Sequence, residues 1–245
     1  MDIVVLLNTT GKGKVDEIIR GIIGIFEMVF PGRIRGYYLT GSYSDGSAIT
    51  TSDIDMFIIF KDSFTNGEEE MAWQLWLYCE QIGFVKIDLI PISEERLLHE
   101  GNIAVKITSL LMYGEDMRDN IPLPVFDMYL HGVTEASFSY LAGVLRDAQC
   151  LVFPLGYPDP TGMFYGYDAK DSRTETKGLV SSVCRAATAI VALKSGRYVG
   201  KKSDSIKSYK DYVNDDWTGF LEEMYERAES AGAIVSRRTR LSATG

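Results

Sequence analysis

The chain has 245 residues, of which 46% are hydrophobic and 24% charged, so it can bury a core and has the composition of a globular protein. Its 25 basic and 34 acidic residues give a net charge of −9, which disfavours nucleic acid as the main partner and suits a cationic substrate. The three cysteines are far apart and only two histidines accompany them, which argues against a disulfide framework and a structural zinc site.

Nothing in the sequence indicates secretion or a membrane span. The N-terminus lacks the basic region and cleavage pattern of a signal peptide. The longest apolar run, Ile18–Phe30, is too short to cross a bilayer and contains Arg20 and Glu27. We therefore expect a soluble cytoplasmic protein with no membrane partner, whose oligomeric state the sequence does not indicate.

The hydrophobic pattern of the first half predicts an α/β domain. Dense apolar positions at helical spacing predict a first helix, which Pro31-Gly32 ends. Short apolar runs predict strands, and three glutamates suited to a helix dipole begin the second helix. The expected order is helix, strand, strand, helix, strand and helix, over Val15–Phe30, Ile34–Thr40, Ile54–Phe60, Glu68–Ile82, Val85–Pro91 and from Ser93.

Strand signals fade after Pro122-Leu123-Pro124, and the second half is expected to be mainly helical. Helical spacing covers Phe126–Val152, Leu179–Leu193 and Trp217–Ala231. The long connection Pro154–Thr176 is rich in Gly, Pro and Tyr, which is typical of a lid or cleft loop. The predicted fold class is therefore α+β, with an α/β domain over residues 1–122 that contains a short mixed sheet and a helical domain over residues 123–245.

Two acids at the start of the second strand are the most informative feature. Asp53 and Asp55 are two residues apart, so on a strand they face the same side with Cα atoms about 6.5 Å apart, while Ile54 points into the core. Two such carboxylates repel each other unless a cation neutralises them. The cation that usually joins carboxylates, phosphate oxygens and water is Mg²⁺.

Residues on either side of this acid pair extend the pattern. Gly41-Ser42 follows the first strand, where glycine lets backbone N–H groups approach an anion and the serine hydroxyl can donate to a phosphate oxygen. Asp88 lies within the third predicted strand, and it would join the pair if that strand lies beside the second. An Asp-x-Asp alone commonly marks a turn, and an exposed acid at a strand end remains an alternative for Asp88.

Gly41-Ser42, Asp53-Ile54-Asp55 and Asp88 together resemble the motif of the polymerase-β-type nucleotidyltransferase superfamily. Within it the chain resembles the bacterial streptomycin/spectinomycin adenylyltransferases. Leu110–Asp116 is similar to the segment that ends their nucleotidyltransferase domain, and Leu179–Trp217 is similar to their C-terminal helical domain. The resemblance covers most of the chain and is specific in the first motif.

The resemblance implies roles for particular residues. Asp53 and Asp55 would bind two Mg²⁺ ions, Ser42 would hold the triphosphate of ATP, and Asp88 would be a metal ligand or the base that activates the acceptor hydroxyl. The sequence departs from the family at two places. The third acid is commonly Glu, and the helix after the Gly196 turn often carries acids, whereas this chain has Asp88 and the segment Lys201–Lys207.

The segment from Lys177 to Lys210 holds eight basic residues and one acid in an otherwise acidic chain. One interpretation is a solvated loop with lysines near helix C-termini. The other is a cationic wall that the helical domain contributes to the triphosphate across a cleft, with Lys201 and Lys207 as the candidate residues. Both interpretations are open at this stage.

The predicted function is transfer of AMP from ATP to a hydroxyl of a small molecule, such as an aminoglycoside-like antibiotic, with a nucleoside triphosphate and that acceptor as the partners. One alternative is an antitoxin-like adenylyltransferase that acts on a protein hydroxyl. Another is a nucleotide-binding module without turnover. The intact acid pair argues against the last, because such modules lose their metal ligands.

Overall fold

The computed structural model describes residues 4–49, 52–82, 85–145 and 176–226. The chain divides into two compact units, Met1–Pro124 and Val125–Gly245. The division falls close to the boundary expected after residue 122, and the assignment of residues 1–122 and 123–245 as two domains stays a prediction. The predicted fold class is confirmed, because unit 1 holds helices and a four-stranded mixed sheet and unit 2 shows helices where it is described.

The sheet of unit 1 has the strand order β3-β2-β1-β4. Strand β1 (Ile34–Thr40) is antiparallel to both of its neighbours, β2 (Ile54–Phe60) and β4 (Leu110–Gly114), whereas β2 is parallel to β3 (Ile87–Ser93). Six of the seven residues of β1 and of β2 are buried, because side chains cover both faces of these central strands. The parallel pair requires a crossover connection, which α3 (Glu68–Ile82) provides.

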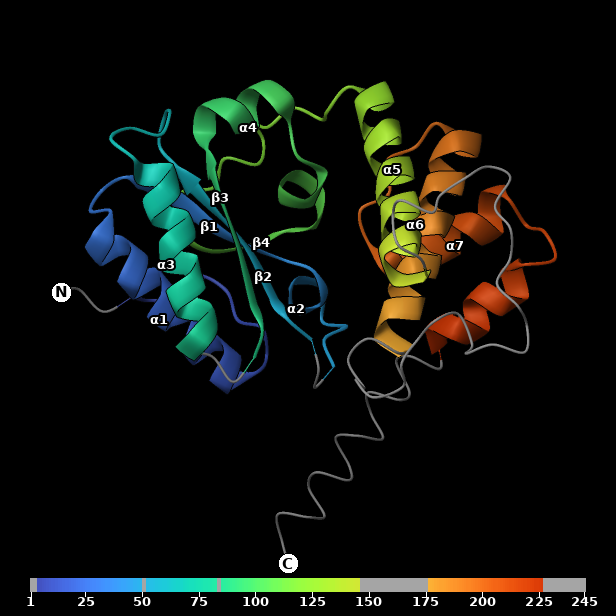
Figure 1. The fold of residues 1–245 in the computed structure, drawn as a ribbon, viewed down its shortest axis with the longest axis horizontal. Helices are drawn as coiled ribbons and strands as arrows, with labels where there is room; N and C mark the ends of the chain where they lie inside the picture. Colours follow the sequence, from blue (N-terminus) through green and yellow to red (C-terminus); the bar gives the residue numbers. More distant parts are fainter. Residues whose placement is uncertain (1–3, 50–51, 83–84, 146–175, 227–245) are drawn as a thin grey trace, which may run out of the picture. The chain divides into compact units, whose positions relative to one another are not determined.

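Helices cover both faces of the sheet (Figure 1). On one face, α1 (Gly13–Val29) and α3 enclose a core that includes Ile19, Phe26 and Ile54. On the other face, α4 (Glu94–Glu100) and the π-helix η1 (Ala104–Thr108) enclose a second core with Tyr38 at its centre. The short helix α2 (Ser42–Asp45) follows β1 directly.

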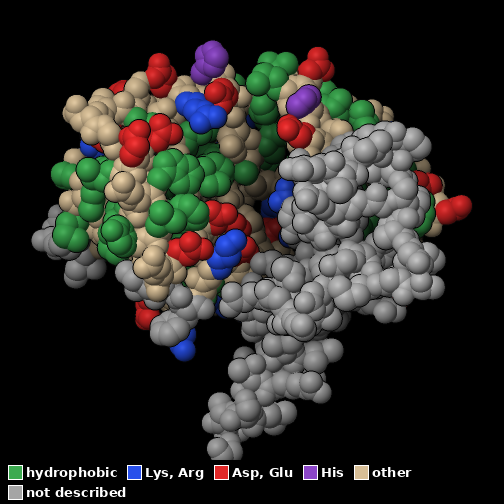
Figure 2. All heavy atoms as spheres, in the orientation of Figure 1, with side chains coloured by type: hydrophobic (Ala, Val, Ile, Leu, Met, Phe, Trp, Pro, Cys, Tyr) green, Lys and Arg blue, Asp and Glu red, His purple; other side chains and the backbone are tan. Residues whose placement is uncertain are grey.

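Helix α3 packs on β3 through one side and exposes hydrophobic residues on the other. The indole Nε1 of Trp76 donates to the carbonyl of Ile87 at 2.9 Å, and Ala72 and Cys79 are buried. Figure 2 shows hydrophobic side chains gathered over this helix, where Met71 and Tyr78 are among the exposed residues. The contacts that hold α3 in place are therefore mainly those of the side that faces β3 and the core.

Unit 2 contains α5 (Phe126–Leu145), α6 (Thr176–Ser195), α7 (Lys202–Tyr212) and a helical segment over residues 218–226. Cys184, Val191 and Ile206 belong to its core. The Tyr129 hydroxyl accepts from the N–H of Val199 at 2.9 Å and donates to the carbonyl of the same residue at 3.2 Å. The described part of this unit contains no strand, as the sequence predicts.

Several predicted bounds are confirmed and others change. The strands at Ile34–Thr40 and Ile54–Phe60 and the helix at Glu68–Ile82 have the predicted bounds, whereas the strand predicted at Val85–Pro91 begins at Ile87. Strand β4 and helix η1 were not predicted. The connection Pro154–Thr176 lies outside the described residues apart from Thr176, as do 146–152 and 227–231 of the predicted helices.

An ion pair joins the chain just before β1 to the start of α3. Arg33 donates to both carboxylate oxygens of Glu68, at 2.7 and 3.0 Å, and the N–H of Thr65 donates to one of them at 2.8 Å. These bonds, with the Arg33 side-chain bond as the largest cause, lower the pKa of Glu68 to about 2. Ionised Glu68 therefore stabilises the folded protein.

This ion pair predicts a loss of stability in acid. The pKa of Glu68 is about 4.3 in the unfolded chain, so its contribution is fully present above about pH 5 and is lost as the pH falls through about 2. We expect Glu68→Gln to remove about 1–2 kcal/mol at pH 7, allowing for screening by water, and almost nothing once the pH is below about 2. Urea unfolding of this variant, wild type and the exposed control Glu69→Gln across that range measures the effect. Equal pH dependence in all three would contradict the prediction.

Candidate active site

Three neighbouring strands place polar residues in one row at the end of the sheet. Thr40 of β1 lies opposite Asp55 of β2, and Asp55 lies opposite Asp88 of β3. Residues directly opposite each other in a sheet project to the same face. The second and third strands are therefore adjacent, which is the condition that the sequence analysis set for Asp88, and Asp55 and Asp88 lie side by side although 33 positions separate them in the sequence.

Three acids lie at or beside this row. Asp53, Asp55 and Asp88 are half-buried, whereas Ile54, between the first two, is fully buried. Asp53 lies just before the first residue of β2, and Asp53, Asp55 and Asp88 all keep part of their surface exposed. Ile54 has no exposed surface and belongs to the core under α1 and α3. Asp55 therefore lies on the opposite sheet face, as the sequence predicts, and a solute can reach it there.

Gly41 makes room for the Asp55 carboxylate. Its φ of +66° lies in the region that favours glycine, and a Cβ added there would overlap the Asp55 side chain. Ser42, the first residue of α2, follows immediately and is half-buried. The Gly41-Ser42 turn and the acid row are thus parts of one site.

Two residues that the sequence reasoning missed also contribute to this region. Tyr43 is buried, and burial, followed by the nearby Asp53 carboxylate, raises the pKa of its hydroxyl. The buried Ser52 hydroxyl accepts from the N–H of Ile49 at 2.9 Å, which orders the turn before Asp53. Both residues lie inside the motif, and this position was the signal that could have identified them. For Ser52 the reason is that a serine beside a turn commonly bonds to nearby backbone.

The donor set of the row fits magnesium. The described residues contain no group of three or more His, Cys, Asp or Glu side chains placed to hold a metal by themselves. Magnesium is usually bound by one or two carboxylates and completes its shell with phosphate oxygens and water. Asp55 and its neighbours supply such carboxylates, and the absence of a Cβ at Gly41 leaves room for the one on Asp55.

The two candidate lysines belong to unit 2. Lys201 is the residue before α7, without a capping side-chain hydrogen bond, and Lys207 is exposed within that helix. Asp204 lies in the first turn of the same helix. The predicted contact of Lys201 and Lys207 with a triphosphate stays a prediction.

Comparison with known families identifies the domain that carries the row. Residues 19–110 match the family model described as the nucleotidyltransferase domain. The N-terminal unit thus carries the match to the nucleotidyltransferase domain. Its matched part runs from within α1 to the start of β4 and includes the Gly41-Ser42 turn and all three acids. The predicted resemblance to nucleotidyltransferases and the predicted enzyme class are confirmed.

Several solved structures are similar to this chain over part or most of its length. Spectinomycin adenyltransferase AAD(9) from Enterococcus faecialis, solved with ATP and spectinomycin, matches 86% of this chain and 98% of its own, with 12% identity and a TM-score of 0.48. A putative nucleotidyltransferase from Sulfolobus solfataricus matches 42% of this chain and 82% of its own, with 21% identity and a TM-score of 0.30.

A toxin-antitoxin structure with AMP-PNP matches 50% of this chain and 89% of its own, with 19% identity and a TM-score of 0.30. No curated protein matches the chain. At these identities and TM-scores the solved structures leave the substrates of this chain open. No helix of the described residues is long and apolar enough to cross a membrane.

Proposed function

We propose that the protein transfers AMP from ATP to a hydroxyl of a small molecule in a Mg²⁺-dependent reaction. The observation that carries this proposal is the row in which Asp55 lies between Thr40 and Asp88, with Gly41 leaving room beside the Asp55 carboxylate. A site of this kind combines acids for a cation with a glycine turn that an anion can approach.

Each residue of the site has a part in the proposed reaction. Asp53 and Asp55 would hold two Mg²⁺ ions, as the family resemblance implies. When bound, Mg²⁺ lowers the pKa of the attacking hydroxyl and neutralises charge on the phosphates. The Ser42 hydroxyl donates to the triphosphate, and the peptide N–H groups of the Gly41-Ser42 turn, whose Gly41 lies against the Asp55 carboxylate, assist it.

The transfer step uses Asp88 as the proton acceptor. Its carboxylate takes the proton of the acceptor hydroxyl while that oxygen bonds to the α-phosphorus of ATP. The bond from this phosphorus to the bridging oxygen breaks in line, and pyrophosphate leaves with the electron pair. The position of Asp88 opposite Asp55, one of the proposed metal ligands, supports this role.

The acceptor that we propose is a cationic small molecule such as an aminoglycoside. The net charge of −9 supports it, because an acidic protein attracts a polycation. Lys201 and Lys207 would contact the triphosphate rather than this acceptor. The cytoplasm, where ATP is abundant, is the location that the reaction requires.

The proposal is tested with purified protein, ATP labelled in the α-phosphate, Mg²⁺ and a panel of hydroxyl acceptors that includes aminoglycosides. We expect pyrophosphate release that depends on both Mg²⁺ and an acceptor, with the label on the small molecule. Label on protein would instead favour the antitoxin-like alternative. Absence of both release and labelling with every nucleoside triphosphate would refute transferase activity.

The role of Asp88 is tested by Asp88→Asn. We expect kcat to fall by at least about 10²-fold, the scale of a positioned general base, with a smaller effect on ATP affinity. The same change at Asp62, an exposed residue that follows β2, serves as a control and should leave kcat unchanged. Initial rates of pyrophosphate release at saturating ATP measure both variants. A kcat for Asp88→Asn within twofold of wild type would remove Asp88 from the mechanism.

A further inference from the structure

The side chain of Ser44 lies between two backbone carbonyls that belong to different segments. Its Oγ is 2.7 Å from the carbonyl oxygen of Gly41 and 2.9 Å from that of Thr108. The Ser44 N–H also donates to the Gly41 carbonyl, at 3.1 Å. The hydroxyl has a single proton, which these two acceptors share, so Ser44 ties the Gly41-Ser42 turn to the end of η1.

The Thr108 carbonyl, which accepts the Ser44 hydrogen bond, belongs to a helix that other hydrogen bonds hold in place. The Thr108 hydroxyl donates to the carbonyl of Ala104 at 3.0 Å, which stabilises the last turn of the helix. The ammonium group of Lys106 donates to the carbonyls of Arg118 and Ile121, at 3.0 and 2.5 Å. The Thr108 carbonyl therefore projects from a helix that is itself fixed to the segment after β4.

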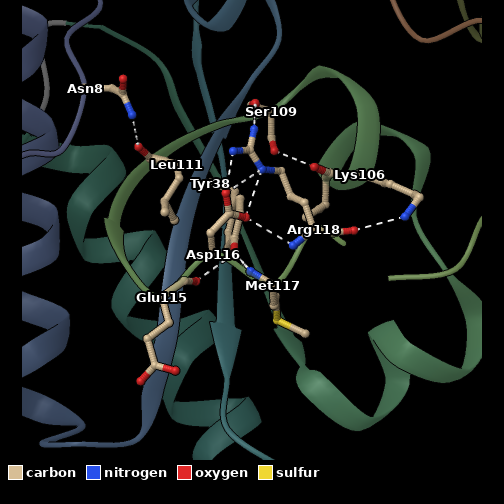
Figure 3. A network of polar contacts seen from close by, with 10 residues as sticks. Asn8, Tyr38, Lys106, Ser109, Leu111, Glu115, Asp116, Met117 and Arg118 are labelled. Atoms are coloured by element: carbon tan, nitrogen blue, oxygen red, sulfur yellow. Dashed lines mark hydrogen bonds and ion pairs between the residues drawn. The ribbon is translucent and has the colours of Figure 1, made fainter. Parts of the chain in front are cut away.

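A second set of contacts fixes the residue after η1, as Figure 3 shows. The Arg118 guanidinium donates to the carbonyl of Ser109 at 3.1 Å and pairs with Asp116. The Tyr38 hydroxyl accepts from the N–H of Met117 at 2.8 Å and donates to the carbonyl of Glu115 at 2.9 Å. This network connects the segment after β4 to the centre of the sheet, so Ser44 bonds to a rigid frame.

The Gly41 peptide needs such an external constraint. Glycine has no Cβ to restrict its φ and ψ angles, and Gly41 has a φ of +66° with the Asp55 carboxylate against it. Rotation of the Gly41 carbonyl turns the whole peptide between Gly41 and Ser42, including the Ser42 N–H.

We propose that Ser44 is a positioning residue that fixes the Gly41-Ser42 turn in its nucleotide-binding conformation through the Thr108 carbonyl. This inference rests on the proposed function, because the turn is the part of the site that would receive the triphosphate. Ser44 itself contacts backbone only, so its effect reaches the nucleotide through Gly41 and Ser42.

The test compares Ser44→Ala, Ser44→Thr and Ser47→Ala in the full chain. Ser47 provides a matched control, because it lies three residues away and its hydroxyl donates to the exposed Asp45 carboxylate at 2.6 Å. Calorimetric titration with Mg²⁺ and a non-hydrolysable ATP analogue gives the affinity, thermal unfolding gives the stability, and initial rates separate kcat from the KM for ATP.

We expect Ser44→Ala to weaken nucleotide binding and raise the KM for ATP by at least about tenfold, the scale of one hydrogen bond to a constrained group. Its kcat at saturating ATP should change less than threefold and its melting temperature by less than about 3 °C. Ser44→Thr keeps the hydroxyl and should restore the affinity to within threefold of wild type. Ser47→Ala should match wild type.

Two outcomes would overturn the inference. Nucleotide affinity of Ser44→Ala equal to that of wild type would show that the turn does not need Ser44, and affinity loss that Ser44→Thr does not restore would show that the hydroxyl is not the cause. If Ser44→Ala does not fold, Ser44→Cys replaces it with the same thresholds. A wild-type protein that binds no nucleoside triphosphate refutes the proposed function, and the inference falls with it.

Discussion

Asp53→Asn and Asp55→Asn are each expected to lower the rate of AMP transfer by at least about 10³-fold while the protein stays folded. Asp55 lies opposite Asp88 with the Gly41 backbone against its carboxylate, and Asp53 precedes it by two residues. A neutral amide has nearly the same shape as the carboxylate but cannot neutralise divalent cations. Crowded acids also repel one another, so the melting temperature of each variant should equal or exceed that of wild type.

Mg²⁺-dependent pyrophosphate release and thermal unfolding measure these two effects separately. Asp62→Asn again supplies the same chemical change outside the row. Mg²⁺ titration of the ATP analogue complex adds a readout that does not require turnover, and the apparent Mg²⁺ affinity should fall in both variants. Turnover within tenfold of wild type in either variant would contradict the assignment of that acid as a metal ligand.

Gly114→Ala is expected to destabilise unit 1 by about 3 kcal/mol or more. Gly114 ends β4 with a φ of +96°, and a Cβ there would overlap the backbone carbonyl of Arg35 and approach the Cα of Gly36 to 2.7 Å. Both obstacles are backbone atoms of the central strand, so neither can move aside. The change therefore combines an unfavourable φ with a collision inside the sheet.

Gly21→Ala provides the matched control for this prediction. Gly21 lies within α1 with no atom within 4 Å of an added Cβ, so alanine should raise the free energy of unfolding by about 0.5–1 kcal/mol. Urea unfolding of the two variants and wild type gives both values. A loss below 1 kcal/mol for Gly114→Ala would show that the strand end can relax around the new methyl group.

The sequence predicts most of unit 1 because its elements have strong local patterns. Strand β2 is a nearly continuous apolar run, β1 follows the Pro31-Gly32 stop and contains the run Tyr37–Leu39, and α3 begins with an acidic turn, so their bounds are predicted without error. Strand β4 has only five residues and lies at the sheet edge, where its pairing with β1 depends on contacts distant in the chain. No local pattern distinguishes such a segment from a buried loop.

In the site too, features that depend on local sequence spacing could be predicted, and contacts between residues distant in the chain could not. The spacing of Asp53 and Asp55 is a local feature that predicts their shared face, and the alternation of β3 places Asp88 beside them only once the β2–β3 register is known. The contact between Gly41 and Asp55 and the bond from Ser44 to Thr108 join residues 14 and 64 positions apart. Composition and periodicity carry no signal for contacts of this kind.

Both outer strands of the sheet are protected from pairing with another molecule. The N–H of Leu7 donates to Met112 at 2.8 Å and the side-chain amide of Asn8 donates to Leu111 at 2.8 Å, so residues before α1 occupy the outer side of β4. At the opposite edge, Pro91 in β3 has no N–H to offer. Exposed strand edges promote aggregation, so removal or rearrangement of residues 4–8 would make the protein prone to associate through β4 at high concentration.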